Sequence, residues 1–428
     1  MLLNVGGMVM EFHRHQLLRC GLRGTCLAVL LNRFPGWLLT DAEGVHFVDA
    51  DPFYFIWFTV MLYLGDRIDV SEICEGCPSA FPFYHDRFFA KTDLNTEPQT
   101  GDHEGDAFRQ FMAEMGAFIH SSAGGTSGSE VLTARVDDLT VATTDATLDD
   151  FDTLHERFSK YRGPVVDVSA DHLRKIVDYL RRIRIASDAA IPLPTSTSPG
   201  ELLYACEMYG LMEQVYLSMI GKSHSHIQCI LKSSHDDCEF HTLVQRAEGL
   251  QGGLLFVVES EREARRHRFA CHIDGPLIAP SDPTAELCTG CPVTFYSISG
   301  AFEEADGIVK IAIPNDQQWM TVAGTQGTVT NTDGVLHCKV AIGGGRLWLG
   351  CAKDRPAGDL RRCAQWVKRI ELPVGKTYRG GFFHDNGYAT LATSFGFTCA
   401  DMEIYTLQPD CGWEWLRAVA DVLLSPST

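Results

Sequence analysis

The chain has 428 residues, of which 45% are hydrophobic and 21% are charged, a composition that excludes global disorder. This length predicts about two to four domains, each able to bury a core of its own. The formal net charge is −19, which argues against nucleic acid or an anionic membrane as the main partner, because either needs a cationic surface.

The N-terminal region and the longest apolar run indicate whether the protein is exported or spans a membrane. It has no basic segment followed by a small-residue cleavage site, so we expect no secretory signal and reduced thiols for the 15 cysteines. The longest apolar run, Phe53–Leu64, is shorter than the roughly 20 residues of a membrane-spanning helix and predicts a buried core helix. The strongest basic feature, the Arg-Arg pair that begins at Arg181, is interpreted as part of a solvated helix face.

Three polar stretches separate the periodic segments. Thr92–Asp106 is acidic and without periodicity, which predicts a linker, and Ser121–Ser129 has the composition of a flexible Gly/Ser tether. Ile191–Gly200 is rich in Pro, Ser and Thr and precedes a helical pattern. We therefore expect the chain to divide near residues 121–129 and again near 221–226.

An internal repeat relates the two N-terminal segments. Val48–Asp49 matches Val166–Asp167, and Tyr63–Leu64 matches Tyr179–Leu180, with a slightly shorter spacing in the second copy. Between these anchors each copy carries apolar residues at i, i+3, i+4 and i+7, the pattern of an amphipathic helix. We interpret the two segments as tandem copies of one module. The alternative is that they are two unrelated amphipathic helices.

Both copies also contain helix start signals. Asp51–Pro52 and Ser169–Asp171 each precede the helical pattern, and Asp and Ser side chains accept hydrogen bonds from the free amides of a first turn. Ala113–Gly116 and Cys206–Gly210 then resemble each other near the ends of the copies.

The N-terminal motifs Leu3–Gly7 (LNVGG), Asp41–Phe55 (DAEGVHFVDADPFYF) and Tyr63–Gly65 (YLG) resemble the potassium-channel tetramerisation type of BTB/POZ domain. That family opens with an LNVGG strand and continues through a GxxFxDRDP-like strand-to-helix turn. The second copy is similar but departs at Val136–Asp138, which stands in place of the two glycines, and it ends in the helical run Glu201–Leu211.

The resemblance implies a small sheet with helices that associates with copies of itself. Two such modules in one chain predict either a pair formed within the chain or recruitment of further chains. A second copy that merely supports the first is the other interpretation.

From about residue 227 to 407 the chain changes character. Short β-branched or aromatic runs are punctuated by Gly, Asp and Pro, which is typical of a largely β domain. The predicted strands lie within Leu254–Val258, Val293–Ile298, Ile308–Ile313, Val335–Val340 and Leu347–Leu349.

The motifs of this region resemble a TLDc domain. Gly252–Val258 (GGLLFVV) and Thr294–Ile298 (TFYSI) are similar to its opening half, and Ile342–Leu349 (IGGGRLWL) and Met402–Leu407 (MEIYTL) to its second half. Phe269–His272 (FACH) departs from the Phe-Gly-Gly-Tyr-like turn usual there. The resemblance implies a two-layer, mostly β, non-catalytic fold and the vacuolar proton pump as one class of partner.

Several cysteines and histidines have spacings that could suit a metal site. Two Cys-x-x-Cys pairs, Cys74–Cys77 and Cys288–Cys291, have zinc-ligand spacing but lie in different predicted domains, and no spacing selects His85 or His272 to complete a site. We expect free thiols, with zinc or a redox pair as alternatives. The histidines between His224 and His241 are interpreted as a fortuitous group in a linker.

Catalytic motifs are not recognisable. Gly343–Gly345 precedes a strand pattern, so it predicts a tight turn and not a phosphate cradle. Ser297–Gly300 lacks the leading glycine of a nucleophile elbow, and acidic pairs such as Glu303–Glu304 carry no signal in so acidic a chain. We therefore assign no catalytic, cofactor-binding or metal-binding residue, and we expect no cofactor and no enzymatic activity.

The predicted fold class is α+β, with two BTB/POZ-like α/β modules followed by a mostly β, two-layer TLDc-like domain. We expect the first module at residues 1–120 with an insertion at 76–106, a Gly/Ser linker at 121–128, a degenerate second module at 129–221, the TLDc-like domain at 227–408 and a C-terminal amphipathic tail at 409–428.

The expected function is that of a non-catalytic, cytoplasmic interaction scaffold. It forms homo- or hetero-oligomers through the BTB/POZ-like modules and binds a large protein partner, a vacuolar proton pump or a cytoskeletal assembly, through the TLDc-like domain. A substrate adaptor of a cullin ubiquitin ligase is the alternative, and an enzyme is the third class. A potassium channel is excluded, because no segment is long and apolar enough to cross a membrane.

Overall fold

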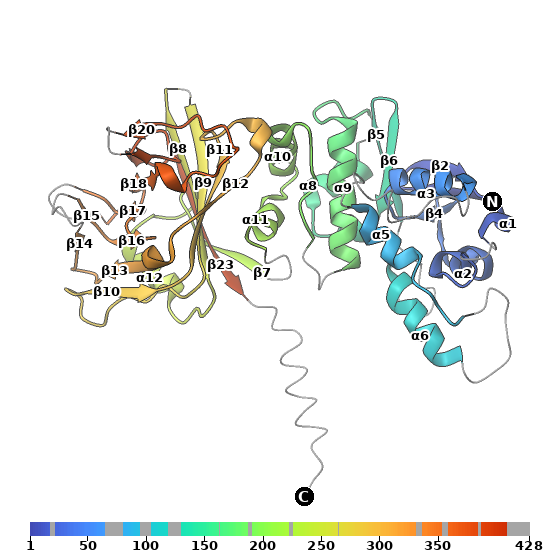
Figure 1. Ribbon diagram of the computed structural model, residues 1–428, viewed down its shortest axis with the longest axis horizontal. Helices are drawn as coiled ribbons and strands as arrows, with labels where there is room; N and C mark the ends of the chain where they lie inside the picture. The colour runs from blue at the N-terminus through green and yellow to red at the C-terminus, as the bar shows by residue number, and fades with distance from the viewer. Residues whose placement is uncertain are drawn as a thin grey trace, which may run out of the picture. The chain divides into compact units, whose positions relative to one another are not determined.

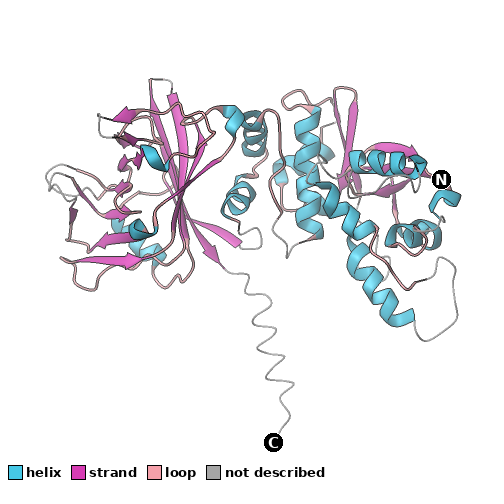
Figure 2. Cartoon of the chain, viewed as in Figure 1, coloured by secondary structure: helices cyan, strands magenta, loops and turns pink. Residues whose placement is uncertain are grey.

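The structure is a computed structural model that describes residues 1–17, 22–64, 80–94, 104–118, 130–161, 163–186, 191–221, 226–263, 265–330, 336–352, 358–383 and 387–408. The chain divides into two compact units. Unit 1 comprises Met1–Ser196 with Glu201–Ser218, and unit 2 comprises Thr197–Gly200 with Met219–Thr428. Helices predominate in unit 1 and strands in unit 2 (Figure 2), which confirms an α+β chain with a mostly β C-terminal region.

The first module of unit 1 (residues 1–118) is built on a four-stranded sheet. Its elements are β1 Leu2–Val5, β2 Met8–Glu11, α1 Arg14–Leu17, α2 Cys26–Arg33, η1 Pro35–Trp37, β3 Leu39–Thr40, β4 His46–Val48, α3 Pro52–Leu64, α5 Ala80–Phe88, α6 Glu104–Met115 and η3 Gly116–Phe118. The strand order is β2-β1-β4-β3. Strand β1 pairs antiparallel with β2 and parallel with β4, which places Val5 opposite both Met8 and Val48.

The second module (residues 130–218) repeats this hairpin and parallel-strand arrangement in a reduced form. Its elements are β5 Val131–Val136, β6 Leu139–Thr144, α7 Asp145–Leu148, α8 Asp152–Ser159, α9 Ala170–Ile185, α10 Pro199–Met208 and α11 Met212–Ile220. Strands β5 and β6 form a hairpin, and Val165 bridges Val136 in parallel. Val165 thus takes the place that Val48 has beside Val5, one residue earlier than the sequence match of Val48 with Val166.

Both hairpin turns use a left-handed backbone. Gly6 has a φ of 55° and Gly7 a φ of 105°, and Asp137 at the second turn has a φ of 51°. Asp is among the few residue types that tolerate this region, because its short polar side chain can hydrogen-bond to the local backbone. The second hairpin therefore forms without the two glycines.

Helix α3 corresponds to the long apolar run. The predicted helix is confirmed, and Asp51 caps it by accepting a hydrogen bond from the Phe53 amide at 2.9 Å. The prediction of a buried core helix holds for the face that carries Tyr54, Phe55 and Phe58, whereas Phe53, Ile56 and Val60 are exposed along another face. The apolar pattern at i, i+3, i+4 and i+7 does not identify the buried face, because the other positions of this run are apolar too.

Unit 2 contains two six-stranded antiparallel sheets, in the orders β10-β13-β16-β17-β18-β22 and β12-β11-β9-β8-β23-β7 (Figure 1). The strands of the two sheets are β7 His226–Lys232, β8 Leu254–Arg262, β9 Arg265–Ile273, β10 Glu286–Gly290, β11 Val293–Ser299, β12 Val309–Ala312, β13 Trp319–Ala323, β16 Val340–Ile342, β17 Leu347–Leu349, β18 Arg362–Gln365, β22 Gly396–Thr398 and β23 Asp401–Gln408. The remaining elements are α12 Phe240–Ala247, η4 Glu304–Asp306, η5 Asn315–Gln317, η6 Arg369–Glu371, β14 Val329–Thr330, β15 His337–Cys338, β19 Val367–Lys368, β20 Phe382–Phe383 and β21 Tyr388–Ala389.

The core of unit 2 unites side chains of both sheets. Phe256 and Phe295 of one sheet share a buried cluster with Ile342 and Leu347 of the other. The last strand, β23, lies between β8 and β7, so the C-terminal segment joins the strand that opens this unit. This packing accounts for the runs of apolar residues in the β-rich part of the sequence.

Most local predictions in unit 2 are confirmed. Each strand prediction overlaps an observed strand, and Gly343–Gly345 forms the turn between β16 and β17, with φ values of 66°, 65° and 77°. Phe269–His272 lies inside the continuous strand β9. The predicted C-terminal amphipathic tail at 409–428 lies outside the described residues, as does the tether 121–129. No helix in the described part of the chain is long and apolar enough to span a membrane.

Candidate interface between the two modules

A buried carboxylate connects the two modules of unit 1. Asp49 follows β4 at the turn into α3, and only 3% of its surface is exposed. Its Oδ1 accepts hydrogen bonds from Thr143 Oγ1 at 2.8 Å and from Arg181 Nε at 2.6 Å. Its Oδ2 accepts from Thr144 Oγ1 at 2.8 Å and from Thr147 Oγ1 at 2.6 Å. All of these donors belong to the second module.

Arg181 completes the interface from the side of α9. Its guanidinium also donates to the carbonyl oxygen of Ala142, and its side chain is 0% exposed. The interpretation of this Arg-Arg pair as a solvated helix face was therefore wrong, since Arg182 is buried too. Sequence alone could not reveal the error, because the carboxylate that neutralises Arg181 lies 132 positions earlier.

A second ion pair lies next to the first. Asp51 caps α3 with one carboxylate oxygen, and its Oδ2 accepts a hydrogen bond from Arg174 NH1 at 2.8 Å. The Arg174 guanidinium also lies over the ring of Phe53, 4.3 Å from its centroid. The turn between β4 and α3 therefore presents two acidic residues to two arginines on one face of α9.

The middle of α9, between Arg174 and Arg181, is joined to α5. Tyr84 donates from its hydroxyl to Asp178 Oδ1 at 2.7 Å, and Arg182 Nε donates to Asp178 Oδ2 at 2.9 Å. All three side chains are buried. Together with the Asp49 and Asp51 pairs, this contact fixes α9 along its length.

Backbone contacts bring the two hairpins together. The Ala142 amide donates to the Gly6 carbonyl oxygen at 2.9 Å. A Cβ atom on Gly7 would lie 2.3 Å from the Thr140 carbonyl oxygen, well inside van der Waals contact. Figure 1 shows the β5–β6 hairpin beside α9 and beside the strands of the first module. The LNVGG glycines are therefore required by the close approach of β6 as well as by their φ angles.

The electrostatics of the interface favour the ionised form of Asp49. Burial by itself would raise the pKa of Asp49, but the Arg181 and Arg184 cations and the threonine hydroxyls outweigh it and lower that pKa. Burial and the neighbouring Asp178 charge instead raise the pKa of Asp51, against the opposing effect of Arg174. Burial raises the pKa of Tyr84 well above its ordinary value, so the phenol stays a hydrogen-bond donor.

The two modules contribute different surfaces. The first contributes the β4–α3 turn, the Gly6–Gly7 turn and Tyr84, whereas the second contributes β6, α7 and α9. Asp167, which the sequence repeat matches to Asp49, pairs with Arg157 inside its own module at 2.7 Å. The interface is therefore heterologous, joining unlike surfaces of two similar modules. The donors of the second module pair with the carboxylates of the first, so the arrangement suits association.

The residues weighed for metal and thiol chemistry lie apart. Cys288 is exposed on β10 and Cys291 is buried just after it, and burial raises the pKa of Cys291 to about 11, so the thiol is protonated at neutral pH. His85 stacks on Phe89, with ring centroids 4.4 Å apart. Within the described ranges, no group of three or more His, Cys, Asp or Glu could hold a metal ion. Cys74–Cys77 and His224 lie outside those ranges.

Sequence reasoning missed the interface residues as a set. The acidic turn at Asp49 and Asp51 falls within the motif Asp41–Phe55, but no local pattern in the sequence pairs it with the threonines of β6. The available signal was the presence of Asp and Arg at positions flanked by apolar residues, where a charge requires a partner. A scan against protein-family models and a search of curated proteins found no match for this chain.

Proposed function

We propose that the chain is a non-catalytic interaction scaffold. In this proposal two BTB/POZ-like modules pair through the Asp49–Arg181 interface, and a TLDc-like unit holds a large partner, a vacuolar proton pump or a cytoskeletal assembly. Unit 1 supplies a rigid support, and unit 2 supplies the surface that recognises the partner.

One observation carries the proposal: Asp49 of the first module is enclosed by donors from the second. Burying a charge is costly unless a partner and hydrogen bonds replace its water. The buried Asp49 carboxylate is therefore stable only when the surfaces of the two modules meet in this one register. Association of such modules with copies of themselves is what the BTB/POZ resemblance implies.

The topology of unit 2 supports the second half of the proposal. The motifs that resemble a TLDc domain fall on the strands β8, β11, β16, β17 and the closing strand β23. The two sheets bury their apolar faces against each other and leave loops and edges for recognition.

The exposed face of α3 favours a second candidate, the cullin adaptor. Phe53, Ile56 and Val60 form a partly exposed apolar stripe on the first module, with the Arg174 guanidinium over the Phe53 ring. A helix groove or surface on a cullin would be one partner for such a stripe. The stripe alone does not distinguish a cullin from another helical protein.

Affinity purification of the tagged full-length chain from its native cells, after chemical cross-linking, tests the proposal. Wild type is compared with Ile56→Asp, which places a charge in the α3 stripe and leaves unit 2 unchanged. We expect near-stoichiometric proton-pump or cytoskeletal subunits with both proteins, quantified by mass spectrometry.

Other outcomes contradict the scaffold proposal in distinct ways. A near-stoichiometric cullin that is captured by wild type and lost with Ile56→Asp makes the adaptor the correct function. Recovery of no near-stoichiometric protein with either chain overturns the scaffold.

A further inference from the structure

Unit 2 exposes several apolar side chains in the segment that carries the small sheet β19-β21-β20. Among its described residues, four of the five exposed large apolar side chains lie between positions 370 and 395: Ile370, Val374, Phe382 and Phe395. Ile370 is 89% exposed and Phe382 is 53% exposed. Scattered apolar side chains on a surface are ordinary, whereas a local concentration marks a site of interaction.

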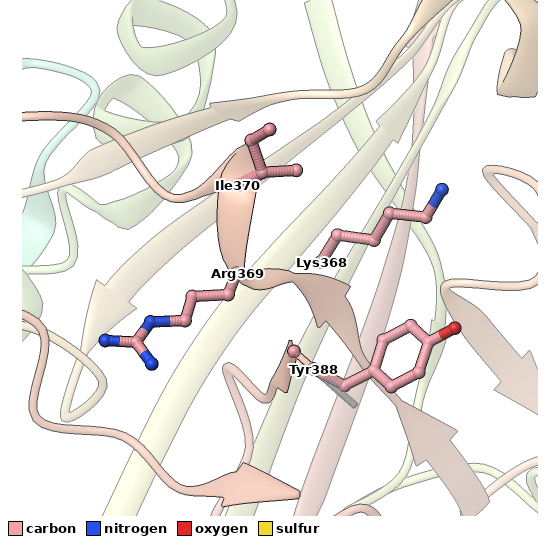
Figure 3. A pocket seen from close by; sticks show the side chains of 5 residues that line it. Lys368, Arg369, Ile370 and Tyr388 are labelled. Carbon is pink, nitrogen blue, oxygen red and sulfur yellow. The ribbon is translucent and has the colours of Figure 1, made fainter. Parts of the chain in front are cut away.

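This segment borders an open hollow of about 510 Å³ lined by Lys368, Arg369, Ile370, Gly387 and Tyr388. Figure 3 shows Lys368 and Tyr388 extending to one side of the turn, Arg369 extending to the other and Ile370 projecting above them. An apolar side chain is therefore flanked by cations and by a phenol. Apolar and polar groups thus lie side by side around the hollow, as they do at protein interfaces.

The turn that carries Ile370 is held rigidly from beneath. Glu371 accepts a hydrogen bond from Arg346 Nε at 3.0 Å and another from the Lys368 amide at 2.8 Å. The Arg346 side chain is fully buried and also donates to the Gly343 carbonyl oxygen at 2.7 Å. The Gly343–Gly345 turn thus positions Arg346, which fixes η6 and its exposed residues. A preorganised site loses little conformational entropy when it binds.

The charge of this segment opposes that of the chain. Residues 361–382 contain the cations Arg361, Arg362, Lys368, Arg369, Lys376 and Arg379 and the single acid Glu371, in a chain of net charge −19. Three of the cations pair with carboxylates of other segments. Within the described residues neither Lys368 nor Arg369 has a carboxylate partner, and the Arg369 guanidinium lies 4.9 Å from the Phe382 ring centroid.

We propose that the surface formed by Lys368, Arg369, Ile370, Phe382 and Tyr388 docks an acidic segment of a partner protein. One apolar side chain of that segment enters the hollow against Ile370, and its carboxylates pair with Lys368 and Arg369. The inference rests on the proposed function and specifies the chemistry of the partner. A polyanion such as nucleic acid or an anionic membrane presents many charges to a chain of net charge −19, whereas a short acidic segment presents few, so long-range repulsion disfavours the polyanion more strongly.

Binding of short fluorescein-labelled peptides to the full-length chain tests this surface by fluorescence anisotropy. The peptides carry one Leu or Phe flanked by Asp and Glu, and the matched set replaces Asp and Glu with Lys. We expect the acidic set alone to bind. The double variant Lys368→Glu/Arg369→Glu should weaken binding at least about tenfold, and Ile370→Ser should weaken it by a similar factor.

The matched control is Lys310→Glu/Arg265→Glu, which reverses two exposed cations on other strands of unit 2 and should leave affinity within about twofold. Equal binding by the lysine peptides, or binding insensitive to Lys368→Glu/Arg369→Glu, overturns the surface. Binding to phosphatidylserine vesicles in place of the acidic peptides overturns it as well.

The cross-linking experiment separates this inference from the proposed function. If wild type and Lys368→Glu/Arg369→Glu capture the same pump or cytoskeletal subunits equally, the scaffold stands and the docking surface is wrong. If acidic peptides bind through Lys368 and Arg369 but cells yield no near-stoichiometric partner, the surface is supported and the scaffold is contradicted.

Discussion

Asp49 illustrates how a single residue sets the register of two modules. The carboxylate exchanges its hydration for hydroxyl, amide and guanidinium donors that are available only when the second module is in place. A buried ion pair adds little net stability over an apolar substitute, but removing one partner leaves the other charge uncompensated. The interface is thus better understood as a determinant of specificity than as a source of net stability.

We expect Asp49→Asn to destabilise unit 1 by about 3–5 kcal/mol, because Arg181 would stay buried without its counter-ion. Urea unfolding of the full-length chain measures this loss. Asp150→Asn is the matched control: Asp150 is exposed, and its substitution should change the free energy of unfolding by no more than about 0.5 kcal/mol. Equal effects of the two substitutions would show that the Asp49 pair is not a structural contact.

Comparison of wild type with Asp49→Asn also predicts how the stability that Asp49 contributes changes with pH. Because the pKa of Asp49 is lowered in the folded chain, the unfolded chain takes up this proton first as the pH falls. The stabilisation from Asp49 is therefore complete above about pH 5, begins to fall near about pH 4, and is lost progressively as the pH drops towards the lowered pKa of the folded chain. The difference between wild type and Asp49→Asn in free energy of unfolding should narrow as the pH falls below about 4, while other groups titrate in both proteins and cancel. A difference that widens on acidification contradicts the lowered pKa.

At the scale of elements, the Gly6–Gly7 turn is where the two hairpins meet. Gly7→Ala requires a left-handed alanine, at about 1–2 kcal/mol, and also overlaps the Thr140 carbonyl oxygen, which adds about 1–3 kcal/mol. Gly44→Ala is a matched control, since Gly44 has a φ of 77° but no atom within 4 Å of an added Cβ. The losses in free energy of unfolding caused by the two substitutions should therefore differ by the cost of the overlap alone. If Gly7→Ala is no worse than Gly44→Ala, β6 does not pack against this turn.

Elements governed by neighbouring residues were predictable, and those governed by distant ones were not. The caps at Asp51 and Ser169, the Gly343–Gly345 turn and the strand pattern of unit 2 follow from residues within a few positions of each other. The exposed face of α3 and the burial of Arg181 depend on what packs against them. No periodicity within the helix encodes that information.

At the scale of the whole molecule, the heterologous interface has a consequence for assembly. Such an interface leaves one unlike surface unused on each module, and repetition of the same contact would extend the array or close a ring. Here the second module has Ser169 where the repeat places Asp51, so the acidic pair is not reproduced at its own turn. The intrachain pair is thus the contact for which the complementary charges are present.

The most direct test of this account is whether the two modules stay together once the chain between them is cut. A protease site is placed within residues 121–129 of the full-length chain, and the cleaved protein is sized by light scattering after gel filtration. The account predicts that the fragments of the wild-type sequence co-elute with the mass of the intact chain, and that Asp49→Arg makes them separate. Separation of the wild-type fragments, with unit 1 otherwise folded, would contradict it.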